Sequence, residues 1–145
     1  MTRAAVGVLT ALLVLASGAG AEHEVYYRYV VLGYVKDARG TPLPGAAVEL
    51  VRDKTALIYG AKSDADGLFL IIARLGDESA GETLTLRAGT VTARVVARFD
   101  PGNHTDPRGT RVDLEGKQFV ERSPLFRPTL ARILEPTARR DRSQK

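Results

Sequence analysis

The chain has 145 residues, of which 44% are hydrophobic and 26% are charged, as in globular proteins rather than in disordered or membrane-spanning chains. It contains no cysteine, which excludes disulfides, cysteine-ligated zinc, iron–sulfur clusters and a thiol nucleophile. The formal net charge of +4 comes from the end of the chain, because basic residues outnumber acidic ones from Glu121 onward and the preceding domain is close to neutral. We therefore expect no nucleic-acid partner.

Residues 1–21 have the pattern of a secretory signal peptide. Arg3 supplies the positive charge, residues 4–16 form an apolar stretch, and Ala19-Gly20-Ala21 is a small-x-small cleavage site. The apolar stretch is shorter than the ~20 residues of a membrane span. The sequence therefore predicts an exported protein, periplasmic or secreted, with no transmembrane span after signal removal; retention of the signal as an anchor is the alternative.

The chain after the signal is dominated by short runs with a period of two, separated by turn residues. Seven strands are predicted, at residues 26–37, 46–51, 55–62, 68–73, 83–88, 91–99 and 110–114. No connection between them is long enough for a crossover helix. We therefore predict one all-β domain over residues 22–116, a seven-stranded sandwich.

The predicted strands differ in how many faces they bury. Residues 68–73 are apolar at nearly every position, which indicates a strand covered on both faces. Residues 91–99 alternate, so that Val95 and Ala97 share one face and Arg94 lies on the other. This strand should therefore have one wet face.

Residues 117–145 have a different character from the domain. We expect an irregular basic C-terminal extension with at most one short helix near residues 129–134, and disorder from about residue 136. Its large apolar side chains should be covered either by the sandwich, which we favour, or by a partner or membrane surface. The side chains that form this possible docking segment are Phe119, Leu125, Phe126 and Leu130, followed by Ile133 and Leu134.

Three sequence elements carry a family resemblance. They are G-x-V-x-D at residues 33–37, G-x-P-L-P-G-A-x-V-x-L at 40–50 and S-D-x-x-G-x-F at 63–69. In this order they resemble the carboxypeptidase regulatory-like domain, a small immunoglobulin-like sandwich of the transthyretin-like or prealbumin-like type. The resemblance implies that Val48, Leu50 and Phe69 fill the core, and that the module is noncatalytic because the catalytic residues of the associated peptidases lie in another domain.

Candidate chemical sites are weak in this sequence. The run Asp64 to Gly67 resembles the opening of a calcium loop, but its later positions lack the oxygen ligands, so a β-turn is expected. Neither His23 nor His104 has a nucleophile motif nearby. We therefore expect no catalytic, cofactor or metal site, and no enzymatic activity.

Tyrosines cluster on the first predicted strand. Tyr26, Tyr27 and Tyr29 fall on both faces, so some should reach solvent and could contact a carbohydrate or a partner, unless they pack as ordinary strand residues.

Two hypotheses for the function of the protein follow. The first is an exported noncatalytic module with a structural or protein-interaction role, whose partner is another envelope or secreted protein. The alternative is a module that binds a small ligand, carbohydrate or metal.

Overall fold

The computed structural model describes the backbone of residues 27–143 and the side chains through residue 135, so the expected signal peptide, His23 and Tyr26 lie outside the described residues. Eight strands, two short 3-10 helices and one α-helix follow one another along this part of the chain. In order they are β1 (Arg28–Lys36), β2 (Ala47–Arg52), β3 (Leu57–Lys62), β4 (Leu68–Arg74), η3 (Asp77–Ser79), β5 (Thr83–Ala88), β6 (Val91–Val96), β7 (Gly109–Glu115), β8 (Gln118–Glu121), η4 (Ser123–Leu125) and α2 (Phe126–Ser143).

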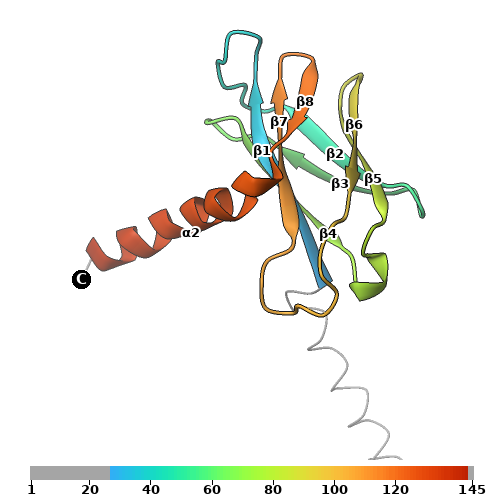
Figure 1. Cartoon of the computed structure of the whole chain (residues 1–145). Helices are drawn as coiled ribbons and strands as arrows, with labels where there is room; N and C mark the ends of the chain where they lie inside the picture. Colours follow the sequence, from blue (N-terminus) through green and yellow to red (C-terminus); the bar gives the residue numbers. More distant parts are fainter. Residues whose placement is uncertain (1–26, 144–145) are drawn as a thin grey trace, which may run out of the picture.

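The strands form two four-stranded sheets that pack as a sandwich (Figure 1). One sheet has the order β4-β1-β7-β8 and the other β3-β2-β5-β6. All pairs are antiparallel except β1 with β7, which join the two ends of the domain in parallel. The predicted all-β sandwich is confirmed at this level.

The core lies between the two sheets and contains the side chains that the sequence placed there. Val48 and Leu50 are fully buried, and Phe69 is 1% exposed. On β6 and just beyond it, Val95 and Ala97 are buried while Arg94 is exposed, as the alternation predicted. The period-two pattern therefore identified the inner faces of these strands correctly.

The predicted number of strands is wrong, because β8 adds an eighth. Gly116 has a φ of +64°, which lets the chain reverse tightly after β7, and Phe119 then pairs with Leu114. The prediction that β4 is covered on both faces is also wrong. Phe69 and Ile71 point into the core, but Ile72 is 47% exposed because it lies on the outer face of the sheet.

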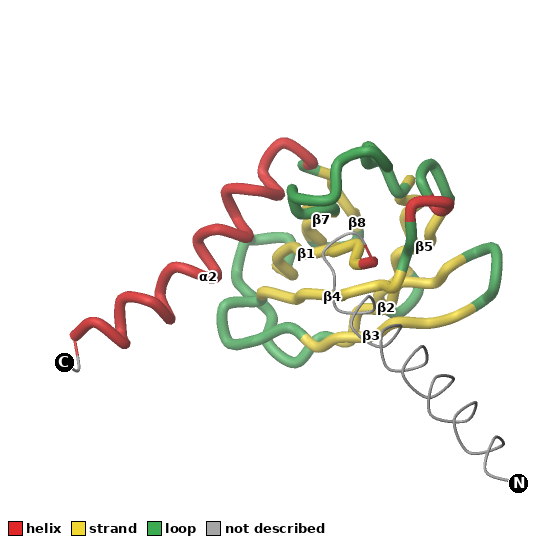
Figure 2. The backbone as a smooth tube through the Cα atoms, turned by 90° about the horizontal axis from the view of Figure 1, so that it is seen from below, coloured by secondary structure: helices red, strands yellow, loops and turns green. Residues whose placement is uncertain are grey.

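The C-terminal extension is ordered rather than irregular: it contributes β8 and η4 and then forms a long helix. Helix α2 spans Phe126–Ser143, which includes residues past 136 where disorder was the expectation. It begins against the outer face of β7 and then points away from both sheets (Figure 1; Figure 2 shows the same departure from below). The contacts of its first turn with the sheet therefore set the position of the helix.

A close approach of β1 to β7 prepares the anchor for α2. A Cβ atom on Gly33 would lie 1.8 Å from the carbonyl oxygen of Val112, so only glycine fits there. The regular ladder is interrupted at this point, and the Tyr34 N–H donates instead to the carboxylate of Asp113, at 3.0 Å. Asp113 thereby becomes a fixed buried anion on the sheet.

Candidate functional site

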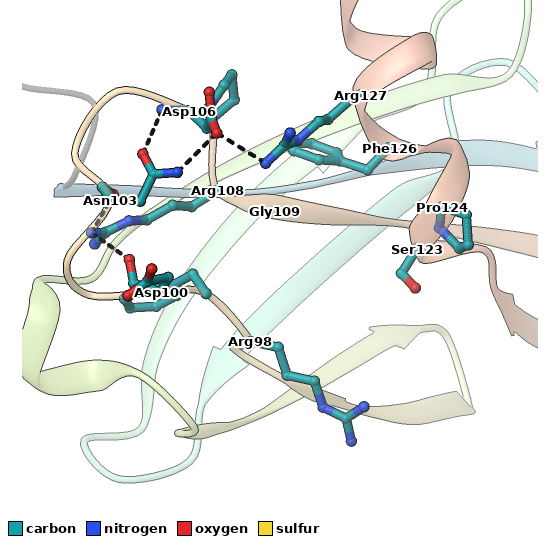
Figure 3. Close-up of a pocket in the computed structure, with 12 residues that line it drawn as sticks. Arg98, Asp100, Asn103, Asp106, Arg108, Gly109, Ser123, Pro124, Phe126 and Arg127 are labelled. Atoms are coloured by element: carbon teal, nitrogen blue, oxygen red, sulfur yellow. Dashed lines mark hydrogen bonds and ion pairs between the residues drawn. The ribbon is translucent and has the colours of Figure 1, made fainter.

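A cavity of about 300 Å³ lies where the loop after β6 meets the beginning of α2. Figure 3 shows Asp100, Asn103 and Arg108 on the loop side and Phe126 and Arg127 on the helix side. Rings and arginines both contribute to the lining. The full lining is Arg98, Phe99, Asp100, Asn103, Asp106, Pro107, Arg108, Gly109, Ser123, Pro124, Phe126 and Arg127.

Arg108 organises the loop side of this cavity. Its side chain is 3% exposed, and its Nη2 donates to the Asp77 carboxylate at 2.9 Å and to the Asn103 carbonyl oxygen at 3.0 Å. The guanidinium also lies 4.2 Å from the centre of the Phe99 ring. A buried arginine that holds a carboxylate, a main-chain carbonyl and an aromatic face fixes the loop in one conformation.

The loop also satisfies its own polar groups. The Asn103 side-chain oxygen accepts N–H bonds from Thr105 and Asp106, both at 3.1 Å, and its Nδ2 donates to Asp106 at 2.8 Å. The Asp100 carboxylate accepts the N–H of Gly102 at 2.9 Å. These Asx-type turns make residues 100–107 a preformed wall rather than a flexible flap.

Asp77 ties the same loop to η3. One carboxylate oxygen of Asp77 forms a hydrogen bond with His104 Nε2, at 2.8 Å, and the other accepts one from Arg108. Burial alone raises the pKa of Asp77, but the hydrogen bonds and charges of Arg108 and His104 outweigh it and hold the pKa below its usual value. His104 therefore serves as a tether of the loop in this structure.

Helix α2 supplies the opposite wall. Phe126 is 3% exposed, and its ring lies on Gly109, where a Cβ atom would meet ring carbons at 2.6 and 2.7 Å. Arg127 reaches Asp106 at 3.4 Å, and both side chains are largely exposed, at 65% and 49%. Such an exposed, long ion pair contributes little. Arg127 is thus a cation at the mouth of the cavity that can exchange its partner.

A buried charge cluster fixes the position of α2. Arg111 binds Asp113 through two hydrogen bonds, at 3.0 and 2.9 Å, and Arg122 binds it at 2.7 Å. Arg111 also donates to the Thr129 hydroxyl at 3.0 Å, and that hydroxyl donates to the Leu125 carbonyl oxygen at 2.6 Å. The hydrogen bond from Arg111 to Thr129 thereby holds the first turn of the helix against the sheet.

The same cluster sets the charge state of Asp113. Burial raises the pKa of this carboxyl, but the hydrogen bonds from Arg111 and from the Tyr34 N–H, with the charge of Arg111, outweigh burial and lower it. Asp113 is therefore ionised at neutral pH. It acts as the counter-ion of both arginines.

The tyrosine cluster does not form one surface. Tyr29 is 1% exposed, its hydroxyl donates to the Val96 carbonyl oxygen at 3.3 Å, and its ring lies 6.1 Å from that of Phe99. Burial raises the pKa of this hydroxyl. Tyr27 is 38% exposed, and Tyr26 lies outside the described residues. Tyr29 is a core residue that packs as an ordinary strand residue, so it is not available to a carbohydrate or partner.

The predicted docking segment divides into covered and uncovered residues. Phe119 packs against the core and Phe126 is buried, as the favoured interpretation required. Leu125 is 42% exposed and Leu130 is half-buried. The sandwich therefore covers the two phenylalanines and leaves part of the segment open.

The run Asp64 to Gly67 forms the expected turn. The Asp64 carboxylate accepts hydrogen bonds from the N–H groups of Asp66 and Leu68, each at 2.9 Å, and Gly67 has a φ of +79°.

Among the residues that the structure describes, no group of three or more His, Cys, Asp or Glu side chains is placed to hold a metal ion. Within the same residues, no helix combines the length and the apolar character needed to cross a bilayer.

Sequence reasoning missed the cavity itself. Residues 100–109 lie between two predicted strands and were assigned no role. One signal was available in the sequence. Asn103 precedes Asp106 by three residues, and both lie between two prolines, a pattern that predicts an ordered turn rather than a loose connection. No pattern in the sequence indicated that Phe126 would close the other side.

No protein-family model matches the chain, and no curated protein sequence matches it. Several solved structures resemble its fold. The mercury-inhibited catechol 1,2-dioxygenase from Acinetobacter sp. ADP1 is 13% identical with a TM-score of 0.40, over 59% of this chain and 43% of that enzyme, so the chain spans less than half of its length. Chlorocatechol 1,2-dioxygenase from Pseudomonas putida is 10% identical with a TM-score of 0.43, over 69% of this chain and 62% of that one.

A third similar structure is the dioxygenase domain of a dioxygenase–carbohydrate-binding protein fusion from Streptomyces sp. SirexAA-E, 20% identical with a TM-score of 0.36, over 66% of this chain and 75% of that one. These comparisons contradict the expectation of a noncatalytic, non-enzymatic module, because the similar structures are enzymes or an enzyme domain. At such low identity and TM-score they bring no substrate and no site residue to this chain.

Proposed function

We propose that the protein binds a small organic acid in the cavity between the loop at residues 98–109 and the start of α2. The observation that carries this proposal is an exchangeable cation at the mouth of a preformed cavity. Phe99 and Phe126 line the cavity, and Arg127 lies at its mouth with a weakly held partner. A small acid would enter the cavity and place its carboxylate on the Arg127 guanidinium.

The size and rigidity of the cavity support a small ligand. Its volume of about 300 Å³ is at the lower end of the range for ligand pockets. The loop wall is held by Arg108 and by the Asn103 turns, so little conformational entropy is lost on binding. Arg98 is exposed on the rim and adds a second positive charge that attracts anions.

The test compares benzoate with benzamide, which has a similar shape and no charge, by isothermal titration calorimetry. Benzoate should bind and benzamide should bind more weakly. Arg127→Ala should weaken benzoate binding about tenfold to a hundredfold, the value of one charge-assisted hydrogen bond. Arg94→Ala, which removes an exposed arginine from β6, is the matched control and should leave the affinity unchanged. Equal binding of the two probes, or an unaffected Arg127→Ala variant, would contradict the proposal.

We also propose that the sandwich is of the carboxypeptidase regulatory-like type and that the protein is exported. The first part is supported by the motif residues, since Gly40 and Gly67 have positive φ angles in turns and Val48, Leu50 and Phe69 are in the core. Export is supported by the sequence pattern of residues 1–21. Fractionation of expressing cells, with mass spectrometry of the mature N-terminus, tests it: a mature chain that begins at Glu22 supports export.

A further inference from the structure

Helix α2 carries an apolar stripe that the sandwich covers only at its start. Phe126, Leu130, Ile133 and Leu134 are spaced so that they share one face of the helix. Phe126 is 3% exposed, Leu130 and Ile133 are half-buried, and Leu134 is 64% exposed. Exposure increases along the stripe because the helix leaves the sheet (Figure 1). The later part of the stripe therefore lacks a cover within the described residues.

The same helix is strongly basic. Its sequence contains five arginines and two acidic residues, whereas the sandwich is close to neutral. Among its residues with described side chains, Arg132 is exposed and lies outside the lining of the cavity at the start of the helix. An apolar stripe on a cationic helix fits a surface that is apolar beneath and anionic above.

A second copy of this chain fits the stripe poorly. Pairing two α2 helices along their stripes would bring two sets of five arginines together, and like charges at such distances repel. Ile133 borders a hollow that Tyr34 and Leu68 line on the sandwich, so the side of the helix that is open to a surface is the one that carries Leu134. Charge therefore favours an anionic surface over another copy.

We propose that α2 binds the surface of an anionic lipid bilayer. The helix lies in the headgroup region, with Leu130 and Leu134 directed toward the acyl chains and Arg132 on a lipid phosphate. This inference is independent of the proposed ligand cavity. It adds a membrane-surface location to the molecule.

The absence of tryptophan from the sequence provides a direct test. In the full chain, Leu134→Trp places a single tryptophan on the stripe. Leu57→Trp, at a comparably exposed leucine (52%) at the start of β3, is the matched control. Emission is recorded with vesicles that contain phosphatidylglycerol, with vesicles of phosphatidylcholine alone, and with brominated acyl chains as quenchers.

The expected result is a blue shift and quenching of the Leu134→Trp variant with phosphatidylglycerol vesicles, and neither change for the Leu57→Trp variant. Adding Arg132→Glu to the Leu134→Trp variant should weaken vesicle binding about fivefold or more, because it reverses one charge near the lipid phosphates. Both tryptophan variants carry the same N-terminus, so attachment through residues 4–16 alone would leave the Leu134→Trp emission unchanged.

Three results would overturn the proposal. An unchanged Leu134→Trp emission would show that the stripe does not enter lipid. An equal shift with phosphatidylcholine alone would show that the arginines do not contribute. A shift without vesicles that grows with protein concentration would show that a second copy covers the stripe.

Discussion

Replacing Phe126 by alanine tests whether the beginning of α2 belongs to the fold. The ring is 3% exposed and lies on Gly109, so its removal loses both buried area and packing. A phenylalanine deleted from a core typically costs ~3–5 kcal/mol. Phe126 borders an existing cavity and lies on the outer face of the sheet, so the expected loss in the free energy of unfolding is at the lower end, ~2–3 kcal/mol.

Urea unfolding followed by circular dichroism measures this loss, with Leu125→Ala as the matched control. Leu125 is adjacent in sequence and 42% exposed, so its truncation should cost under ~1 kcal/mol. A Phe126→Ala midpoint equal to that of Leu125→Ala would refute the packing argument. Gly109→Ala gives an independent check: its Cβ would lie 2.1 Å from the Val30 carbonyl oxygen and would also displace the Phe126 ring, so this variant should be destabilised as well.

Three further predictions concern the sandwich and its extension. Leu50→Ala should cost ~2–5 kcal/mol and Arg94→Ala under ~0.5 kcal/mol in urea unfolding, because the first side chain is fully buried and the second is exposed. Asp113→Asn should lower the free energy of unfolding at pH 7 and make that free energy fall less steeply as the solution is acidified. The pKa of Asp113 is lowered in the folded state, so the ionised carboxylate stabilises the fold above its unfolded pKa of about 4. This contribution is lost as the pH falls through the folded value. Truncation after Glu115 removes β8 and the Phe126 contact, so the melting temperature should fall; an unchanged melting temperature would make the extension dispensable.

The inner faces of the sandwich were predictable from the sequence because burial on one side imposes a period of two. Val95 and Ala97 are buried and Arg94 is exposed, as alternation predicted. The uniformly apolar run of β4 was misleading for a physical reason. Periodicity reports which residues are apolar, but not whether a neighbour covers the second face, and Ile72 remains exposed at the edge of its sheet.

The candidate site could not be predicted because it depends on contacts between distant segments. Asp77, Arg108 and Phe126 come from three parts of the chain, and only the β1–β7 pairing and the reversal at Gly116 bring them to one end of the sandwich. Helix α2 was missed for a related reason. Its apolar stripe is partly left open, so the residue pattern did not distinguish a helix from an irregular basic tail.

The central claim is that the loop and the start of α2 form one ligand cavity, and a titration followed by two-dimensional ¹⁵N–¹H NMR tests it most directly. Benzoate added to the labelled protein should shift the amide signals of residues 98–109 and 123–127 together, with one dissociation constant, while the signals of β2 and β3 stay in place. Shifts that are absent, or that spread over the sandwich without this cluster, would contradict the account.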